Sequence, residues 1–246
     1  MQERRRAATI WLGLHLLPYV DRLLVRYSLV GDPAVFDTAL FPWAAKLERN
    51  WRAIREEADR VLADRDSIPP LRQISPDHRR IAEDDRWRSF FLWGYGIRSE
   101  ANCRRCPRTV ELIERIPDLQ TALFSVLWPG AHIPRHTGVT KAILTCHLGL
   151  RIPKDRERCR IGVADQVHAW RDGKVLVFDD LRPHEIWNET DEDRVVLILH
   201  VKRPMRLPAA LVRDALLAAV RRSAFIQDAR RALDRWDRPG SDAGRR

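Results

Sequence analysis

The chain has 246 residues, which is enough for one sizeable hydrophobic core and does not require two domains. Hydrophobic residues make up 45% and charged residues 32% of the sequence, a balance that is typical of a folded protein and excludes an intrinsically disordered one. The net charge of +10, carried mostly by arginine, favours anionic partners such as nucleic acid, anionic lipid or small carboxylates and phosphates. A genome that prefers arginine codons would give the same excess, so charge alone does not choose a partner.

The first predicted segment, residues 1–32, contains an apolar stretch from Ala7 to Val20 behind the basic start MQERRR. This stretch is short for a transmembrane helix and contains Pro18, and no small-residue cleavage site follows it, as a signal peptide would require. Charges at helical spacing follow in DRLLVRYSLV, which favours an amphipathic segment on an anionic membrane surface. A helix packed on the protein's own core has the same pattern. We expect a cytoplasmic protein that can attach to the inner face of the cytoplasmic membrane.

Residues 33–120 are predicted to be mainly helical and to pack on the core. One amphipathic helix is indicated by apolar residues at three- and four-residue steps: Leu47, Trp51, Ile54, Ala58 and Val61. The proline-bearing segment SIPPLRQISPDHRR predicts a loop, and PRTVELIERI predicts a short helix. Cys103 and Cys106, in CRRC, lack a second well-spaced pair and are weak support for a zinc site. Four cysteines in a chain of this length favour a reducing compartment over a disulfide framework.

From residue 121 to 204 the sequence changes to short runs rich in β-branched and aromatic residues, punctuated by Gly, Pro and Asp. Several short strands at this spacing favour a sandwich or barrel. Between the runs QVHAW and GKVLVFD, Asp172 and Gly173 predict a hairpin turn. Residues 205–246 return to a basic helix and tail. We therefore expect helices on both sides of one β core.

His136 and His184 are the candidate ligands of a metal ion. Each stands at the edge of a predicted strand beside turn-forming residues, in IPRHTG and LRPHEIW, and residues far apart in the chain can converge in a barrel. Two neutral imidazoles suit a divalent transition metal, iron among them. The carboxylate that many such iron sites have two residues after the first histidine is replaced here by Gly138. Four other histidines have the pattern of ordinary core or surface residues: His15, His78, His168 and His200.

Four ordered motifs within residues 84–204 resemble the aspartyl/asparaginyl β-hydroxylase family: FSVLWPGAHIPRHTG, CHLGLRIP, WRDGKVLVFDD and HEIWNETDEDRVVL. The resemblance implies a mainly β protein with a double-stranded β-helix core of the jelly-roll or cupin-like type, flanked by N- and C-terminal helices. It also implies a dioxygenase that depends on Fe(II) and 2-oxoglutarate. The segments YSLVGDPAVFDTALFPW and FFLWGYG are most similar to bacterial members that hydroxylate lipid acyl chains.

Carried over position by position, the resemblance implies that His136 and His184 bind the iron, with Gly138 as the family's own departure from a carboxylate. A water would fill the vacant position, and Asp180 would accept a hydrogen bond from that water. The resemblance further implies four residues around the 2-oxoglutarate: Trp87 as an aromatic wall, Ser125 and Arg194 at its far carboxylate, and His147.

One position departs from the family pattern. Members commonly have Arg two residues before the histidine of HLGL, where this chain has Thr145. The substitution removes a cation from near the metal-proximal carboxylate of the cosubstrate. Three basic residues nearby in the sequence are candidates to replace that charge: Lys141, Arg135 and Arg151.

The resemblance implies a hydroxylase that uses Fe(II), 2-oxoglutarate and O2 on an unactivated C–H bond, with a lipid acyl chain as the favoured substrate. An Asp or Asn residue, free or within a peptide, is an alternative substrate. A non-catalytic β-barrel that binds a small anion is a further alternative. A nucleic-acid partner is disfavoured, because the aromatic residues are not interleaved with a basic stripe.

Overall fold

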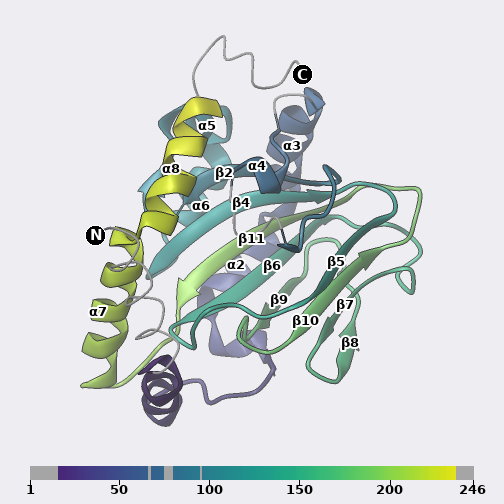
Figure 1. Cartoon of the computed structure of the whole chain (residues 1–246). Coiled ribbons are helices and arrows are strands. Elements are labelled where there is room, and N and C mark those ends of the chain that lie inside the picture. Colours follow the sequence, from purple (N-terminus) through teal and green to yellow (C-terminus); the bar gives the residue numbers. More distant parts are fainter. Residues whose placement is uncertain (1–15, 66–67, 75–79, 95, 237–246) are drawn as a thin grey trace.

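Eleven strands in the described residues form two antiparallel sheets that face one another (Figure 1). The computed structural model describes residues 16–236 except 66–67, 75–79 and 95. The larger sheet has, in spatial order, β1 (Val35–Phe36), β9 (Val175–Phe178), β6 (Ile143–Arg151), β11 (Arg194–Lys202), β4 (Leu119–Leu127), β2 (Trp87–Gly94) and β3 (Ile97–Arg98). The smaller sheet has β5 (Ala131–His136), β10 (His184–Asn188), β7 (Cys159–Val163) and β8 (Gln166–His168).

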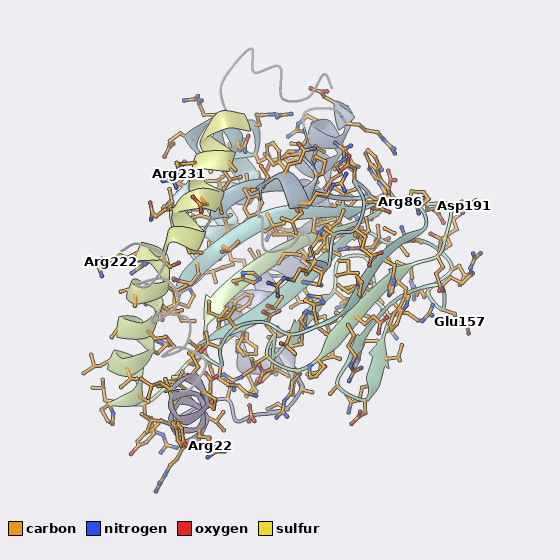
Figure 2. All side chains as sticks on the ribbon, viewed as in Figure 1. Arg22, Arg86, Glu157, Asp191, Arg222 and Arg231 are labelled. Carbon is orange, nitrogen blue, oxygen red and sulfur yellow. The ribbon has the colours of Figure 1, made fainter. Side chains whose placement is uncertain are left out.

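Strands from β4 onward alternate between the two sheets, apart from the neighbouring pair β7 and β8. This winding is that of a double-stranded β-helix, so the predicted fold class is confirmed. The strand runs identified from the sequence between residues 122 and 201 all correspond to strands. Side chains fill the space between the sheets, while charged residues such as Asp191 and Arg231 lie at the edge of the molecule (Figure 2).

The central strands β4, β6 and β11 are near-continuous apolar runs because both of their faces are covered. One face packs against the helices α2 (Pro42–Arg49), α3 (Trp51–Leu62), α5 (Glu100–Arg105) and α6 (Pro107–Ile113). The other face packs against the smaller sheet, with Leu127 and Val196 meeting Ile133 and Ile186 in one buried cluster. The candidate site lies on this second face.

The amphipathic helix predicted around residues 47–61 is two helices, α2 and α3, which meet at Asn50. Its apolar face is confirmed, since Leu47, Ile54 and Val61 are buried. The predicted loop at 67–80 contains a short helix, α4 (Leu71–Ile74). The predicted short helix is α6, and it is anchored by the buried carboxylate of Glu57, which accepts the first backbone N–H groups of that helix.

The range 33–120, for which helices were predicted, also contributes strands β1, β2 and β3 to the larger sheet.

The predicted hairpin at Asp172 and Gly173 is wrong. The two residues do form a turn, with Gly173 at φ +70°, but β8 before it pairs with β7 while β9 after it pairs with β6 and β1. The turn therefore carries the chain from one sheet to the other, because turn residues specify a reversal and not the partner of the strand that follows.

Residues 16–26 form a helix that packs beside α7 (Ala209–Arg222), as Figure 1 shows. Leu24 is fully buried there with Met205 and Leu217, so this part of the N-terminal segment packs on the protein's own core. Most of the apolar stretch from Ala7, with His15, lies outside the described residues, and so does His78. None of the helices in the described part of the chain combines the length and apolarity needed to cross a membrane. The predicted basic C-terminal helix is two helices, α7 and α8 (Ala224–Trp236).

Candidate active site

His136 and His184 lie side by side on neighbouring strands. His136 ends β5, His184 begins β10, and the two Cα positions are paired in the antiparallel register. Their ring centroids are 4.0 Å apart. Nδ1 of His136 contacts the carbonyl of Pro134 at 2.8 Å, and Nδ1 of His184 contacts that of Arg182 at 2.9 Å. Because a carbonyl only accepts, each Nδ1 donates, and each Nε2 of the neutral ring carries the lone pair that a metal ion needs.

The carboxylate of Asp180 lies beside this histidine pair and against Gly138. Its Oδ1 is 3.6 Å from Nε2 of His184, beyond hydrogen-bond distance. A Cβ added to Gly138 would fall 1.9 Å from Oδ2 of Asp180, and the amide of Gly138 donates to the carbonyl of Asp180 at 2.7 Å. The space that a side chain at position 138 would need is thus filled by a carboxylate from the facing loop. Over the described residues, no group of three or more His, Cys, Asp or Glu side chains is arranged to hold a metal ion.

Trp87, Ser125 and Arg194 come together on the inner face of the larger sheet. Trp87 and Arg194 pair with Leu127 of β4 from opposite sides, and Ser125 is two residues along the same strand. Side chains two residues apart on a strand share a face, so all three lie together. Nε1 of Trp87 donates to Oγ of Ser125 at 3.1 Å. These residues were predicted to surround one ligand, and the sheet register gives them a common surface.

Arg194 is a buried cation that has no counterion among the described residues. The residue is 1% exposed, and its Nε and Nη1 have no hydrogen-bond partner in the described structure. Its guanidinium lies 5.0 Å from the ring centroid of Trp170. Burial lowers the pKa of Arg194 to about 10. A buried charge with unused donors is costly, so this guanidinium is chemically suited to an anionic ligand.

His147 lies on the same inner face and presents a donor. Nε1 of Trp170, which can only donate, bonds to Nδ1 of His147 at 3.2 Å. Burial, and next the charge of Arg194, hold the pKa of His147 well below its usual range, so the ring is neutral and its proton is on Nε2. The ring of Phe178 links the two parts of the site, with its centroid 5.1 Å from that of His147 and 5.4 Å from that of His184.

His200 also belongs to this region, although it was predicted to be an ordinary histidine. It is paired across β11 and β6 with Thr145, which is 3% exposed and has a hydroxyl oxygen without a partner in the described structure. Burial lowers the pKa of His200, and the nearby carboxylate of Asp180 partly opposes this effect. The signal that could have identified it is the two-residue period of β11, which returns to the face of Arg194 at position 200.

None of the three basic residues that could have replaced the family's arginine is directed toward Thr145. Lys141 forms ion pairs with Asp32 and Asp179. Arg151 pairs with a carboxylate of α3 at 2.6 Å. Arg135 is exposed and neighbours His136 on β5, so it lies on the opposite face of that strand. The loss of the cation at position 145 is therefore not compensated by any of them.

The sequence pattern of the aspartyl/asparaginyl β-hydroxylase family matches residues 48–204, more than half of the chain. The chain belongs to the aspartyl/asparaginyl β-hydroxylase family. The family match begins well before residue 84, where the resemblance in the sequence motifs was predicted to start. The named relatives are hydroxylases, which supports a hydroxylase activity for this family member as well.

Two relatives of this family member match different shares of its length. The ornithine lipid ester-linked acyl 2-hydroxylase of Rhizobium tropici is 39% identical over 234 residues, covering 95% of this chain and 83% of the relative. The human aspartyl/asparaginyl beta-hydroxylase is 38% identical over 167 residues, covering 66% of this chain and 21% of the human protein. Among solved structures, a predicted oxalate decarboxylase of Thermotoga maritima matches 47% of this chain and 80% of its own at 13% identity, with a TM-score of 0.33, too low to add to the assignment.

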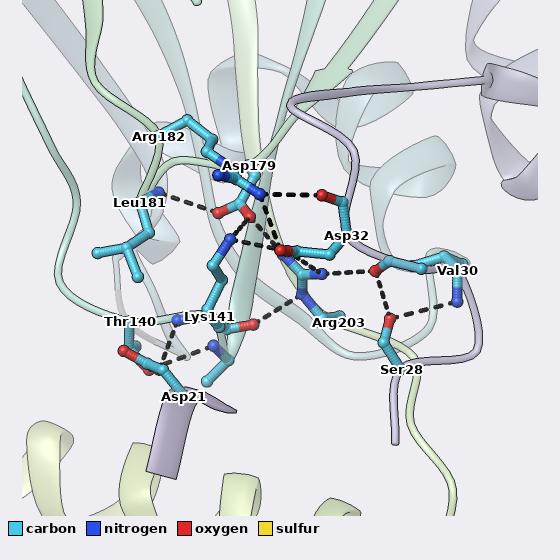
Figure 3. Close-up of polar contacts among 12 residues, drawn as sticks. Asp21, Ser28, Val30, Asp32, Thr140, Lys141, Asp179, Leu181, Arg182 and Arg203 are labelled. Atoms are coloured by element: carbon cyan, nitrogen blue, oxygen red, sulfur yellow. Dashed lines mark hydrogen bonds and ion pairs between the residues drawn. The ribbon is translucent and has the colours of Figure 1, made fainter. Parts of the chain in front are cut away.

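Asp32, Lys141, Asp179 and Arg203 form an ion-pair cluster in which all but Asp32 are buried (Figure 3). Asp179 and Arg203 have fully buried side chains joined at 2.8 Å. Asp179 precedes Asp180 in the chain, and Lys141 follows Gly138 by three residues. The cluster therefore fixes both loops that close against one another beside the histidines.

The four cysteines of this β-hydroxylase family member are free and buried. Burial raises the pKa of Cys103 to about 11 and that of Cys106 to about 12. Both thiols are therefore protonated at neutral pH, and the thiolate is the form that binds metal. The sulfur of Cys103 contacts the carbonyl of Leu92 at 3.4 Å, which indicates a packing role in α5.

Proposed function

We propose that this chain is an Fe(II)- and 2-oxoglutarate-dependent hydroxylase that acts on the acyl chain of a membrane lipid. The main support is the combination of two neighbouring imidazoles on the smaller sheet with a buried guanidinium on the facing larger sheet, two of whose nitrogens lack a hydrogen-bond partner in the described structure. The first arrangement suits a divalent metal, and the second suits a small carboxylate. A hydroxylase of this class needs both.

His136 and His184 would hold the iron through Nε2, because their Nδ1 atoms are committed to backbone carbonyls. These carbonyl bonds also set the orientation of each ring, as outer hydrogen bonds do at many metal sites. Iron, when bound with 2-oxoglutarate, supplies the activation of O2 that an unactivated C–H bond requires. Asp180 would accept a hydrogen bond from a water at the position that Gly138 leaves without a protein ligand.

The residues on the inner sheet face supply donors for a dicarboxylate. Arg194 offers a planar fork of N–H groups, two of its nitrogens being unused in the described structure. The hydroxyl of Ser125 accepts from Trp87, so its own hydrogen remains available to a carboxylate. Nε2 of His147 is a further donor because Trp170 occupies Nδ1. The hydroxyl of Thr145 would donate where relatives have a cation.

A lipid substrate is supported by the extent of the match to the rhizobial relative, which is named for an ester-linked acyl group and covers nearly the whole chain. The N-terminal helix exposes apolar side chains, with Leu16 50% and Tyr19 67% exposed. The net charge of +10 favours an anionic membrane surface. The match to the human relative leaves out about a third of the chain.

Mass spectrometry of the reaction tests this function. Purified protein is incubated with Fe(II), 2-oxoglutarate and O2, together with either membrane lipid or peptides that contain Asp and Asn. We expect one added oxygen on a lipid acyl chain, matched by succinate. An added oxygen on the peptide alone would instead support the alternative substrate.

The ligand assignment is tested in the same assay. His136→Ala and His184→Ala should each lose bound iron and succinate production, because either change removes half of the protein ligands. His132→Ala is a matched control on the same strand, since its ring is half-exposed and pairs with Glu185. Full turnover by either of the first two variants would refute the assignment.

A further inference from the structure

A pocket of about 560 Å³ lies between the N-terminal helix and the two loops that precede and follow the histidine strands. Its wall is mainly apolar: Leu17, Pro18 and Val25 come from the helix, Val139 from the first loop and Leu181 from the second. The volume is in the range of about 300–1,000 Å³ that is typical of small-molecule sites. Charged residues of both signs also line it: Asp21, Arg22, Asp32, Lys141 and Arg182.

This pocket adjoins the candidate active site along both loops. Val139 follows Gly138, and Leu181 follows Asp180. Gly138 and Asp180 are the residues that close against one another beside the histidine pair. A molecule bound between Val139 and Leu181 would therefore contact the residues next in sequence to Gly138 and Asp180, beside the proposed position of the reaction.

The helical wall of the pocket is anchored and not loosely placed. The carboxylate of Asp21, which is 9% exposed, accepts from the hydroxyl of Thr140 at 2.7 Å and from the amide of Lys141 at 2.8 Å (Figure 3). Leu24 is fully buried against α7. These contacts join the helix to the loop that follows His136, so the pocket is a built feature of the fold.

The charges around the pocket favour an anionic group at its edge. Lys141 pairs with Asp32 and Asp179, and Arg182 pairs with Asp32. Arg22 is exposed and projects outward from the helix (Figure 2); its guanidinium stacks on Tyr19, and no ion pair is recorded for it in the described structure. Arg22 therefore remains able to bind an anion beside an apolar cavity.

We propose that this pocket binds one acyl chain of the lipid substrate, with Arg22 contacting an anionic group of the lipid head. The inference rests on the proposed function for the identity of the ligand, but the pocket itself is independent of the metal. The proposal assigns a binding role to the helix at 16–26. The carbons of the lipid acyl chain would then lie next to the loops that carry Gly138 and Asp180.

Photo-crosslinking tests the pocket. The full chain is mixed with vesicles of phosphatidylglycerol whose acyl chain bears a diazirine, irradiated and digested. We expect modified peptides that contain residues 17–25, Val139 or Leu181. Val25→Trp and Val139→Trp should each lower this labelling by about fivefold or more by filling the cavity. Val139 is 66% exposed, so its replacement does not depend on repacking a buried site.

Val167→Trp is the matched control, because Val167 is 67% exposed on β8 in the smaller sheet and does not line the pocket. Its labelling should equal that of the wild type. Labelling confined to other surfaces would contradict the proposal that this pocket binds an acyl chain. Labelling that both cavity-filling variants leave unchanged would contradict it as well. If the wild-type protein is labelled at the pocket but forms no succinate, the proposed function is refuted. The proposal that the pocket binds an acyl chain would still hold.

Discussion

At the scale of single residues, hydrogen bonds decide what each candidate side chain can do. Backbone carbonyls accept from Nδ1 of His136 and His184 and so place the lone pair of each ring on Nε2, whereas Trp170 fixes His147 with Nε2 as a donor. The same residue type therefore serves two purposes within one site. Arg194 is the opposite case, because two of its nitrogens lack a hydrogen-bond partner in the described structure and so suit a ligand.

Arg194→Met should weaken 2-oxoglutarate binding while leaving the fold as stable as before, or more so. Hydrogen bonds to a charged group contribute about 1.5–3 kcal/mol, so the loss should be about 10- to 100-fold in affinity. The stability should not fall, since an apolar side chain of similar length replaces a buried charge without a partner. Isothermal titration calorimetry and thermal unfolding measure the two effects. Unchanged affinity would contradict the assigned role.

The lowered pKa of His147 predicts a loss of stability in acid. The folded state resists protonation of this ring, while the unfolded chain binds a proton near its ordinary pKa of 6.5. The stabilisation is thus complete above about pH 6.5 and declines as the pH falls below that value, by at most about 1.4 kcal/mol per pH unit for one such group. Urea unfolding of the metal-free protein at pH 5 to 8 should show a shallower dependence in His147→Gln. An identical dependence in both proteins would count against the buried neutral ring.

At the scale of the elements, the sheet register brings the site together. Antiparallel pairing of β5 with β10 sets His136 opposite His184, and pairing of β4 with β2 and β11 sets Trp87 and Arg194 around Ser125. A shift of one residue in either pairing would turn these side chains to the other face. The strands therefore position the candidate metal ligands, and the loops that carry Gly138 and Asp180 contact one another beside them.

Gly138→Asp should damage the protein and not create a third metal ligand. The new Cβ would fall 1.9 Å from the carboxylate of Asp180, so one of the two loops must move. Such overpacking costs about 1–3 kcal/mol, and we expect at least tenfold lower activity with it. Thr137→Asp, at the exposed neighbouring position, is the control for the added charge. The double variant Gly138→Asp, Asp180→Gly should regain stability relative to Gly138→Asp alone; if it does not, contact between the two loops is not the cause.

At the scale of the whole molecule, buried charges join segments that are distant in the chain. Arg203, directly after β11, donates to the backbone of Gly31 and Lys141 and pairs with Asp179. The N-terminal segment, both active-site loops and the larger sheet therefore share one polar cluster. This connection explains how the helix at residues 16–26 can form a fixed wall beside the site.

Arg203→Met should destabilise the protein by about 3–5 kcal/mol, because it leaves the fully buried Asp179 with only Lys141 as a charged partner. Arg231→Met is the control, since Arg231 pairs with Asp228 at the exposed surface of α8, where such pairs contribute about 0–1 kcal/mol. Chemical denaturation of the two variants compares them directly. Equal losses would show that the cluster adds no more than a surface ion pair.

Much of the site follows from the sequence because the signals are local. Runs of β-branched residues located the strands, and motifs around His136, His147 and His184 identified the residue types that a metal and a dicarboxylate require. Two features resisted prediction for the same reason. The partner of β9 and the inclusion of His200 depend on which strands pair, and a turn such as Asp172–Gly173 carries no information about that.

The sequence by itself determined the strands after residue 120, the family and the two histidines of the candidate metal site, but not the strands β1, β2 and β3. Only the tertiary structure decided that Asp180 fills the space beside Gly138, that Arg194 is buried with no counterion among the described residues and that an apolar pocket adjoins both loops. The physical reason is that periodicity reflects the environment of each residue along its own strand. Contacts between distant segments depend on packing and charge pairing across the whole fold, which no single segment encodes.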